Sequence, residues 1–347
     1  MGQCAYLINY TDLPGCQIVA LAEMRPGLAA QVAARYAVPR VYPSIPALLD
    51  HADSFDAIIH VNQFQFHGGV VPQLLAAGKP LLTEKPLAHS PDVGRQIVAA
   101  ARATGTPHYL AYHKRCDHAT IAARRLMDQW IDSGAFGRLR YVRIAMPPGD
   151  WVAAGFTHLL RSDEPLPAAV PDPAPANMTD SEFRHYTRLV NYYVHQVNLL
   201  RHLLGDYAVT QADPSGTLLV ARSLPRPGVE PVPAVIEMGT HRTHVDWQES
   251  VFIAFEQAWL RIDLPAPLAV NRPGRLTIFR DQQPLAGETV IPDLPWTHAM
   301  RQQAAYFVQA VRGEPTPLAT SDDGLSDLLT LDQYLRLYLQ EGGQPAD

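Results

Sequence analysis

The chain has 347 residues, which predicts two domains at about 100–200 residues each. Its formal net charge of −6 excludes a general electrostatic affinity for nucleic acid or an anionic membrane surface. The mean hydropathy is −0.09, and no apolar run approaches the ~18 residues of a membrane span. Three cysteines without a CxxC pair exclude a disulfide scaffold and a cysteine-rich zinc site. We therefore expect no nucleic-acid, membrane or metal partner.

The N-terminus predicts a cytoplasmic protein. Residues 1–6 (MGQCAY) begin like a myristoylation signal, but Tyr6 stands where that signal has Ser or Thr. No basic stretch followed by an apolar core and a cleavage site is present.

Lysine is rare: only Lys79, Lys85 and Lys114 occur among 28 basic residues. Each could stand there by chance. Lysine differs from arginine, however, in being a compact donor whose pKa can be tuned.

The first third of the chain alternates short apolar runs with helical patterns. We predict strands at residues 17–22, 41–42, 57–61, 80–83 and 109–112. Helices are predicted at residues 26–36, at 45–49, up to Ala77 and from Ser90 to about 103. This alternation indicates a parallel sheet with helices on both faces, whose ligands bind at the carboxyl ends of the strands.

The rest of the chain predicts an α+β domain with an open, mostly antiparallel sheet. Predicted strands cover residues 139–146, 234–239, 251–255, 259–263 and 276–280. Predicted helices cover residues 118–133, 186–204, 299–311 and 325–339. The proline-rich stretch between Pro147 and Asn177 is expected to be a lid or a disordered connection. We place the domains at 1–117 and 118–347.

Glu23 follows the first apolar run, where an acidic residue can accept both hydroxyls of an adenosine ribose. A solvated carboxylate at a strand end is the simpler alternative. Arg25 leaves the cofactor open, because it could pair with a 2′-phosphate or stack on adenine.

The triplet Glu84-Lys85-Pro86 directly follows a predicted strand. An ammonium at that edge can donate hydrogen bonds to a developing alkoxide and so assist hydride transfer. Pro86 favours an extended Lys85, and their peptide bond can be cis. The alternative is a surface turn.

On the predicted helix 186–204, Asn191, His195 and Asn198 share one face. Histidine is the usual proton carrier near neutral pH. A lone helical histidine is more often structural, which is the alternative here.

Together these features resemble the Gfo/Idh/MocA family of NAD(P)-dependent oxidoreductases, which act mostly on sugars and polyols. The matching stretches are 19–25 (VALAEMR), 56–67 (DAIIHVNQFQFH), 76–87 (AAGKPLLTEKPL), 112–117 (YHKRCD), 195–205 (HQVNLLRHLLG) and 307–324. The AGK…EKP segment is the most specific of them. The resemblance implies a Rossmann-type N-terminal domain, NAD or NADP as cofactor, and a small sugar-like substrate.

By this resemblance Lys85 is the catalytic lysine and His195 the proton-transferring histidine. The cofactor would contact Gly2, Glu23, Arg25, Asn62, Gln63, His67, Glu84, Lys85, His113 and Arg115. The substrate would contact Lys85, Trp151, Asn191, Tyr192 and His195.

The chain departs from the family pattern in three places. Asn191 and Asn198 stand where the family helix carries aspartates, and an amide cannot hold a negative charge. Asn62-Gln63 replaces the usual Thr-Pro. Residues 4–10 (CAYLINY) are predicted to form the helix that follows a GxGxxG loop, with Gly2 as its last glycine. We therefore expect the first strand of the sheet to be missing, which leaves unpaired strand edges.

Three functions remain open on the sequence. The first is a dehydrogenase acting on a secondary alcohol. The second is a glycosidase or lyase in which bound NAD oxidises a sugar transiently. The third is an impaired or non-catalytic relative, because of the departures above. A homodimer or homotetramer is expected, because an open sheet leaves one face uncovered.

Overall fold

The computed structural model describes residues 1–226, 229–239, 243–281 and 286–345. The chain divides into two compact units, which are interleaved in sequence. The first unit comprises Met1–Ala111, Ala154–Pro175 and Met300–Leu325; the second comprises Tyr112–Ala153, Ala176–Ala299 and Ser326–Asp347. A single boundary at residue 117 does not describe this division, because two later segments return to the first unit.

The first unit is built on short parallel strands. β3 (Ile58–His60), β4 (Leu81–Thr83) and β5 (His108–Leu110) form a parallel sheet, and β14 (Ala319–Thr320) pairs antiparallel with β5. β1 (Leu21–Ala22) and β2 (Val41–Tyr42) form a separate parallel pair. The parallel strands therefore lie in two sheets.

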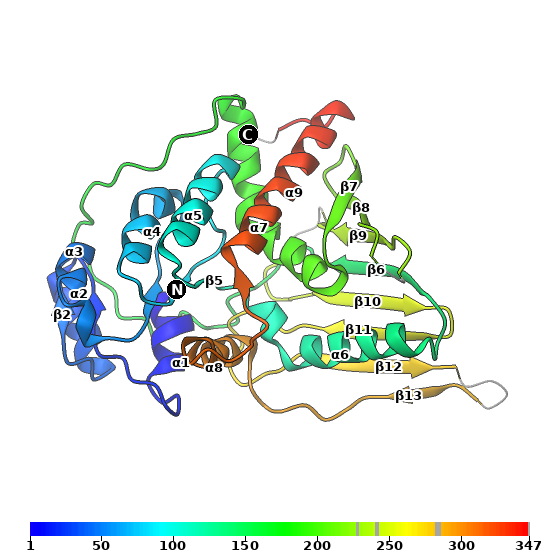
Figure 1. Cartoon of the computed structure of the whole chain (residues 1–347), viewed down its shortest axis with the longest axis horizontal. Coiled ribbons are helices and arrows are strands. Elements are labelled where there is room, and N and C mark those ends of the chain that lie inside the picture. The colour runs from blue at the N-terminus through cyan, green and yellow to red at the C-terminus, as the bar shows by residue number, and fades with distance from the viewer. Residues whose placement is uncertain (227–228, 240–242, 282–285, 346–347) are drawn as a thin grey trace. The chain divides into compact units, whose positions relative to one another are not determined.

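Helices surround these strands, and α4 and α5 lie side by side (Figure 1). The first unit contains η1 (Gly2–Leu7), α1 (Ile8–Tyr10), α2 (Pro26–Arg35), α3 (Ile45–Leu49), η2 (Ala52–Ser54), η3 (Phe64–Phe66), α4 (His67–Ala76), α5 (Pro91–Thr104) and α8 (Ala299–Val311). The helix predicted at residues 4–10 is present, and helical structure begins two residues earlier, at Gly2. Ser90 caps α5 by accepting from the amide of Val93, and Gly105 ends it in the left-handed conformation.

The second unit contains one eight-stranded sheet with the order β13-β12-β11-β10-β6-β9-β8-β7. Its strands are β6 (Leu139–Ala145), β7 (Tyr207–Ala212), β8 (Leu218–Ser223), β9 (Pro233–Glu237), β10 (Ser250–Phe255), β11 (Ala258–Asp263), β12 (Arg275–Arg280) and β13 (Glu288–Val290). Only the β6–β9 pair is parallel among the neighbours in this order, so the prediction of an open, mostly antiparallel sheet is confirmed.

The helices of the second unit are η4 (His113–Cys116), α6 (His118–Ser133), α7 (Asp180–Leu204) and most of α9 (Ser321–Gln340). α6 lies along β11 and β12 (Figure 1). No helix within the described part of the chain is both long and apolar enough to cross a membrane.

Several predicted boundaries were wrong, each for a local reason. α7 begins at Asp180, because Thr179 and Glu182 form a capping box upstream of the apolar pattern. The strand predicted at 17–22 is limited to Leu21–Ala22, where β2 pairs with it. Strands β7 and β8 were missed, and so were β13 and β14. Helix α9 starts four residues earlier than predicted.

Candidate functional site

Glu84 lies between the end of β4 and Lys85, and its carboxylate accepts hydrogen bonds from both Tyr6 and Lys85. The Tyr6 hydroxyl donates to Glu84 Oε1 at 2.8 Å, and the Lys85 amide donates to Glu84 Oε2 at 3.1 Å. Burial and the neighbouring carboxylate raise the pKa of Tyr6 well above its ordinary value. The Lys85-Pro86 peptide bond is cis. Glu84 therefore fixes the Lys85 backbone, and Tyr6 is a partner that the sequence did not reveal.

His67 ties α4 to the chain just beyond Lys85. Its Nδ1 donates to the carbonyl of Leu87 at 3.0 Å, and its side chain is fully buried. Its ring lies 5.6 Å from that of His60, at the end of β3. The predicted neighbours Asn62 and Gln63 are exposed, and the Asn62 side chain accepts from the Gln63 amide.

Glu23 and Arg25 are bonded to each other at the end of β1. Arg25 Nε donates to Glu23 Oε1 at 2.8 Å and Arg25 Nη2 donates to Oε2 at 3.0 Å. The Arg25 amide also donates to Oε1, at 3.1 Å. Although partial burial opposes it, hydrogen bonding to Arg25 lowers the pKa of Glu23. Both predicted adenosine contacts are thus ordered, and each is already engaged.

The proline-rich segment 154–175 brings carboxylates to two helix N-termini of the first unit. Glu164 accepts from the amides of Gly27 and Leu28 at the start of α2. Asp172 accepts from the amides of Gly68 and Gly69 at the start of α4. This segment has neither helix nor strand, as predicted. Its acidic side chains satisfy amides that a helix otherwise leaves without partners.

The starts of α2 and α4 each hold a carboxylate, so negative charge is favoured at both places. Anions bind at helix N-termini, because free amides and the helix dipole both favour negative charge. A Cβ built on Gly27 would lie 2.9 Å from Glu164 Oε2, and a Cβ built on Gly68 would lie 2.7 Å from Asp172 Oδ1. Glycine at each position therefore permits the close approach of the carboxylate. A Cβ on Gly2 would meet no atom within 4 Å. No group of three potential ligands is placed to hold a metal ion within the described ranges.

In the second unit, His195 on α7 lies among aromatic side chains that follow β5 in sequence. Its ring centroid is 4.8 Å from that of His113 and 5.8 Å from that of Tyr112, in both cases edge to face. Tyr112 is buried, and η4 carries His113. The sequence analysis gave His113 as a cofactor contact and His195 as the proton-transferring histidine, and in the structure their rings are in contact.

The other predicted substrate residues occupy two places in this unit. Asn191 and Tyr192 lie on α7, one turn before His195, and the Tyr192 ring is 5.0 Å from that of Tyr193. Trp151 lies outside any helix or strand, and its carbonyl accepts from the amide of Leu268 at 3.2 Å.

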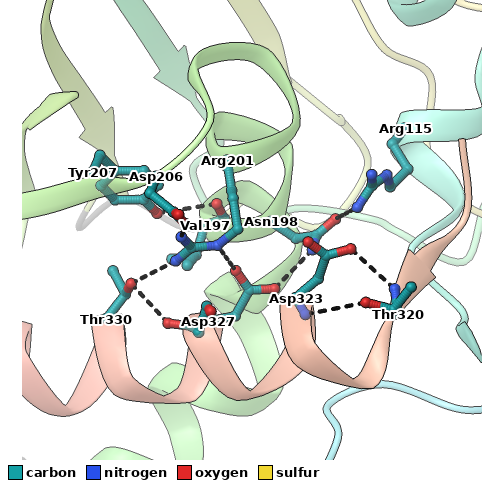
Figure 2. Close-up of polar contacts among 11 residues, drawn as sticks. Arg115, Val197, Asn198, Arg201, Asp206, Tyr207, Thr320, Asp323, Asp327 and Thr330 are labelled. Atoms are coloured by element: carbon teal, nitrogen blue, oxygen red, sulfur yellow. Dashed lines mark hydrogen bonds and ion pairs between the residues drawn. The ribbon is translucent and has the colours of Figure 1, made fainter. Parts of the chain in front are cut away.

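A row of polar side chains runs from the half-buried Arg115 through the buried Asn198 to α9 (Figure 2). Arg115 Nη1 donates to Asn198 Oδ1 at 3.4 Å, and Asn198 Nδ2 donates to Asp327 Oδ2 at 2.7 Å. Arg201 Nε donates to Asp327 Oδ1 at 2.9 Å. An amide fits between a group that only donates and one that only accepts. The sequence noted the amide at 198 as a departure, and Asp327 supplies a carboxylate beside it.

A second buried group joins η4 and α7 to Glu249, the residue before β10. The Lys114 ammonium pairs with the Glu249 carboxylate, and Gln196 Nε2 donates to Glu249 Oε1 at 2.7 Å. The ammonium also lies 5.3 Å from the centre of the Trp247 ring. Burial lowers the pKa of Lys114 despite the opposing effect of Glu249. Of the three lysines, Lys114 is therefore a buried structural cation beside His113.

The predicted site residues fall into two groups, one in each unit. Lys85 belongs to the first group and His195 to the second. Within the first unit the structure orders the predicted residues through Tyr6, Glu164 and Asp172. None of these three was predicted. Tyr6 offers no pattern in the sequence, and the two acids lie in a segment without periodicity.

Dehydrogenases of inositol and of a dihydrobenzenediol are among the curated relatives. Inositol 2-dehydrogenase 2 of Saccharopolyspora erythraea is 27% identical over 201 residues, which cover 58% of this chain and 50% of that protein. Trans-1,2-dihydrobenzene-1,2-diol dehydrogenase of Oryctolagus cuniculus is 33% identical over 147 residues, which cover 40% of this chain and 43% of that protein. The chain thus matches half or less of the length of these relatives.

Solved structures share the fold along nearly the whole chain. Levoglucosan dehydrogenase in complex with NADH and levoglucosan superposes with a TM-score of 0.69 at 16% identity, covering 98% of this chain and 95% of that one. An oxidoreductase from Agrobacterium radiobacter in complex with NAD⁺, L-tartaric acid and magnesium gives a TM-score of 0.66 at 16% identity, covering 97% and 93%.

The family match lies in the first unit. Residues 3–112 match the model GFO_IDH_MocA, described as an oxidoreductase family with an NAD-binding Rossmann fold. This region contains Lys85 and every first-unit residue predicted to contact the cofactor except Gly2. Residues 3–112 are therefore similar to the Gfo/Idh/MocA oxidoreductase family, and the fold of the chain is that of a Rossmann domain joined to a mixed-sheet domain.

Proposed function

We propose that this protein is an NAD(P)-dependent dehydrogenase that oxidises a secondary alcohol of a sugar, a polyol or a related compound, or reduces the matching ketone. One observation carries the proposal most: Lys85 lies two residues after β4, inside the matched family region, and its amide donates to the carboxylate of the buried Glu84. The polyol and diol dehydrogenases among the relatives support the substrate class. We infer that the first unit binds the cofactor and that the second holds the substrate and mediates assembly.

Lys85 and His195 carry the proposed chemistry. The ammonium of Lys85 donates a hydrogen bond to the reacting oxygen and stabilises the negative charge that develops there. His195 accepts the alcohol proton during oxidation and returns it during reduction. The bound nicotinamide supplies the hydride acceptor or donor. The contact of His195 with His113 supports its role, because a neighbouring ring restricts where its imidazole can point.

The cofactor would lie along the carboxyl ends of the strands in the first unit. Glu23 and Arg25 would hold the adenosine ribose, and Gly2 would allow a phosphate to approach the start of η1. Asn62, Gln63 and His67 would flank the cofactor beyond β3. His113 and Arg115 would face both cofactor and substrate, and Glu84 acts by holding Lys85.

Hydroxyl-rich substrates need donors and acceptors held on a rigid element. Asn191 and Tyr192 provide both on α7, one turn from His195. Trp151 offers an apolar ring face against which a sugar ring packs. These side chains, together with Lys85 and His195, are the substrate contacts that we propose.

The test combines the protein, NAD or NADP, and a panel of inositols, sugars and anhydrosugars, followed at the NAD(P)H absorbance band. We expect at least one compound to change that absorbance. Product formation with flat NAD(P)H and with cofactor retained through purification would identify the glycosidase or lyase alternative. If the absorbance does not change with any compound and the cofactor does not raise the melting temperature, the dehydrogenase proposal is refuted. That result would favour a non-catalytic protein.

We further propose a homodimer or homotetramer in the cytoplasm, joined through the open face of the eight-stranded sheet. Phe252, Trp259 and Phe279 on neighbouring strands are all partly exposed, with successive ring centroids 5.7 Å and 5.6 Å apart. Such a row of aromatic side chains suits an interface core. Light scattering should give two or four times the chain mass of 38.3 kDa, and a monomer would contradict the proposal.

A further inference from the structure

The start of α2 bears on which dinucleotide the protein selects. This helix begins at Pro26, immediately after Arg25, and Glu23 lies two residues earlier. In dinucleotide-binding folds, an acid at this place accepts a ribose hydroxyl of NAD, whereas an arginine nearby accommodates the 2′-phosphate of NADP. The sequence left both possibilities open. A phosphate would need Arg25 and the amides at the start of α2.

Glu164 occupies those amides. Its Oε1 accepts from the Gly27 amide at 2.9 Å, and its Oε2 accepts from the Leu28 amide at 3.0 Å. Ser162 Oγ donates to Oε2 at 2.7 Å and also accepts from the Glu164 amide at 3.1 Å. These contacts lower the pKa of Glu164, with the Ser162 hydrogen bond as the largest cause. The carboxylate is therefore ionised at neutral pH and held against the helix.

Arg25 is engaged as well. It donates to both oxygens of Glu23, and the side chains of the pair are only 25% and 23% exposed. Glu164 also acts on Arg25 electrostatically and contributes to raising its pKa. Glu23 thus binds the guanidinium of Arg25, while Glu164 binds the start of α2 and acts on Arg25 through its charge.

We propose that Glu164, carried by the segment 154–175, is a specificity-determining residue that makes the enzyme select NAD over NADP. This inference rests on the proposed function. A 2′-phosphate with its charge of nearly −2 would meet both Glu23 and Glu164 and would have to displace one of them. The ribose hydroxyls of NAD can instead donate to Glu23 without disturbing Glu164.

The test compares the dissociation constants of NADH and NADPH by fluorescence titration in the wild type and in Glu164→Gln. Glutamine keeps the side-chain length and removes the charge. Asp163→Asn is the matched control, because it removes the same charge from an exposed neighbour. Asp172→Asn is a second control, because it loosens the same segment at α4 and leaves α2 unchanged.

We expect the wild type to bind NADH at least about tenfold more tightly than NADPH, which corresponds to about 1.4 kcal/mol. Glu164→Gln should narrow this ratio about tenfold, mainly by tighter binding of NADPH, and neither control should change it more than about twofold. Trypsin cleavage after Arg161, the only arginine or lysine of the segment, checks whether each variant keeps the segment in place.

A wild type that prefers NADPH, an unchanged ratio in Glu164→Gln, or an equal narrowing in either control would overturn the inference. If no form binds either dinucleotide, the proposed function itself fails, which is a separate result. Because the ratio compares two ligands on one variant, a general loss of stability would weaken both and would not imitate the expected change.

Discussion

The two units hold their polar groups in different ways. In the first unit, carboxylates from a loop meet backbone amides, as Glu164 does at α2 and Asp172 at α4. In the second unit, buried side chains meet one another, as Asp327 meets Asn198 and Arg201. Backbone amides at a helix end can exchange one anion for another. Removing one partner of a buried ion pair, by contrast, strongly destabilises the fold. The first arrangement suits a ligand site, and the second suits a rigid frame.

The largest effect on stability should come from breaking the buried pair of Lys114 and Glu249. Lys114→Met should lower the free energy of unfolding by about 3–5 kcal/mol, because it leaves a buried carboxylate without its counter-charge. Urea denaturation measures this loss. Adding Glu249→Gln should recover part of it.

The matched surface pair is Arg95 with Asp92 on α5, at 55% and 70% exposure. Arg95→Ala should lower the free energy of unfolding by less than about 1 kcal/mol. Equal losses in the free energy of unfolding for the buried and the exposed pair would contradict the proposal that buried ion pairs form a rigid frame in the second unit.

Acid should destabilise the protein through the buried histidines of the first unit. Burial lowers the pKa values of His60 and His108 to about 3 from an ordinary 6.5. Below pH 6.5 the unfolded chain binds protons that the folded chain does not, so stability falls as pH falls. Between pH 6.5 and pH 5, each of these histidines should lower the free energy of unfolding by up to about 2 kcal/mol, at about 1.4 kcal/mol per pH unit.

Urea unfolding at pH 7 and pH 5 measures that slope. His60→Gln should flatten it, whereas His158→Gln should not, because His158 is exposed. A slope unchanged in His60→Gln would show that other groups carry the acid sensitivity.

A smaller and more specific effect concerns Asn198. Asn198→Asp would place a second carboxylate about where Asn198 Nδ2 now lies 2.7 Å from Asp327, and should cost roughly 1–3 kcal/mol. Adding Asp327→Asn should restore part of that loss, because an acceptor and a donor face each other again. If the double variant is less stable than the sum of the two single effects predicts, this pairing of Asn198 with Asp327 is contradicted.

The sequence predicted the fold well where local signals are strong. The Ser90 cap, the glycine-ended helices and the alternating runs identified most elements of the first unit. It missed β7 and β8, which depend on pairing with each other and with β9. It named Lys85 and His195 from local motifs, whereas Glu164, Asp172 and Asp327 act through partners more than 100 residues away. Such long-range contacts leave no local pattern.

The most direct test of the proposed dehydrogenase is Lys85→Ala with a compound that the wild type turns over. We expect hydride transfer, measured by NAD(P)H absorbance, to fall about 100- to 10 000-fold while the cofactor still binds. Lys79→Ala, which changes a lysine outside the proposed site, should keep full activity. Activity retained in Lys85→Ala would contradict the role given to this lysine and with it the proposed chemistry.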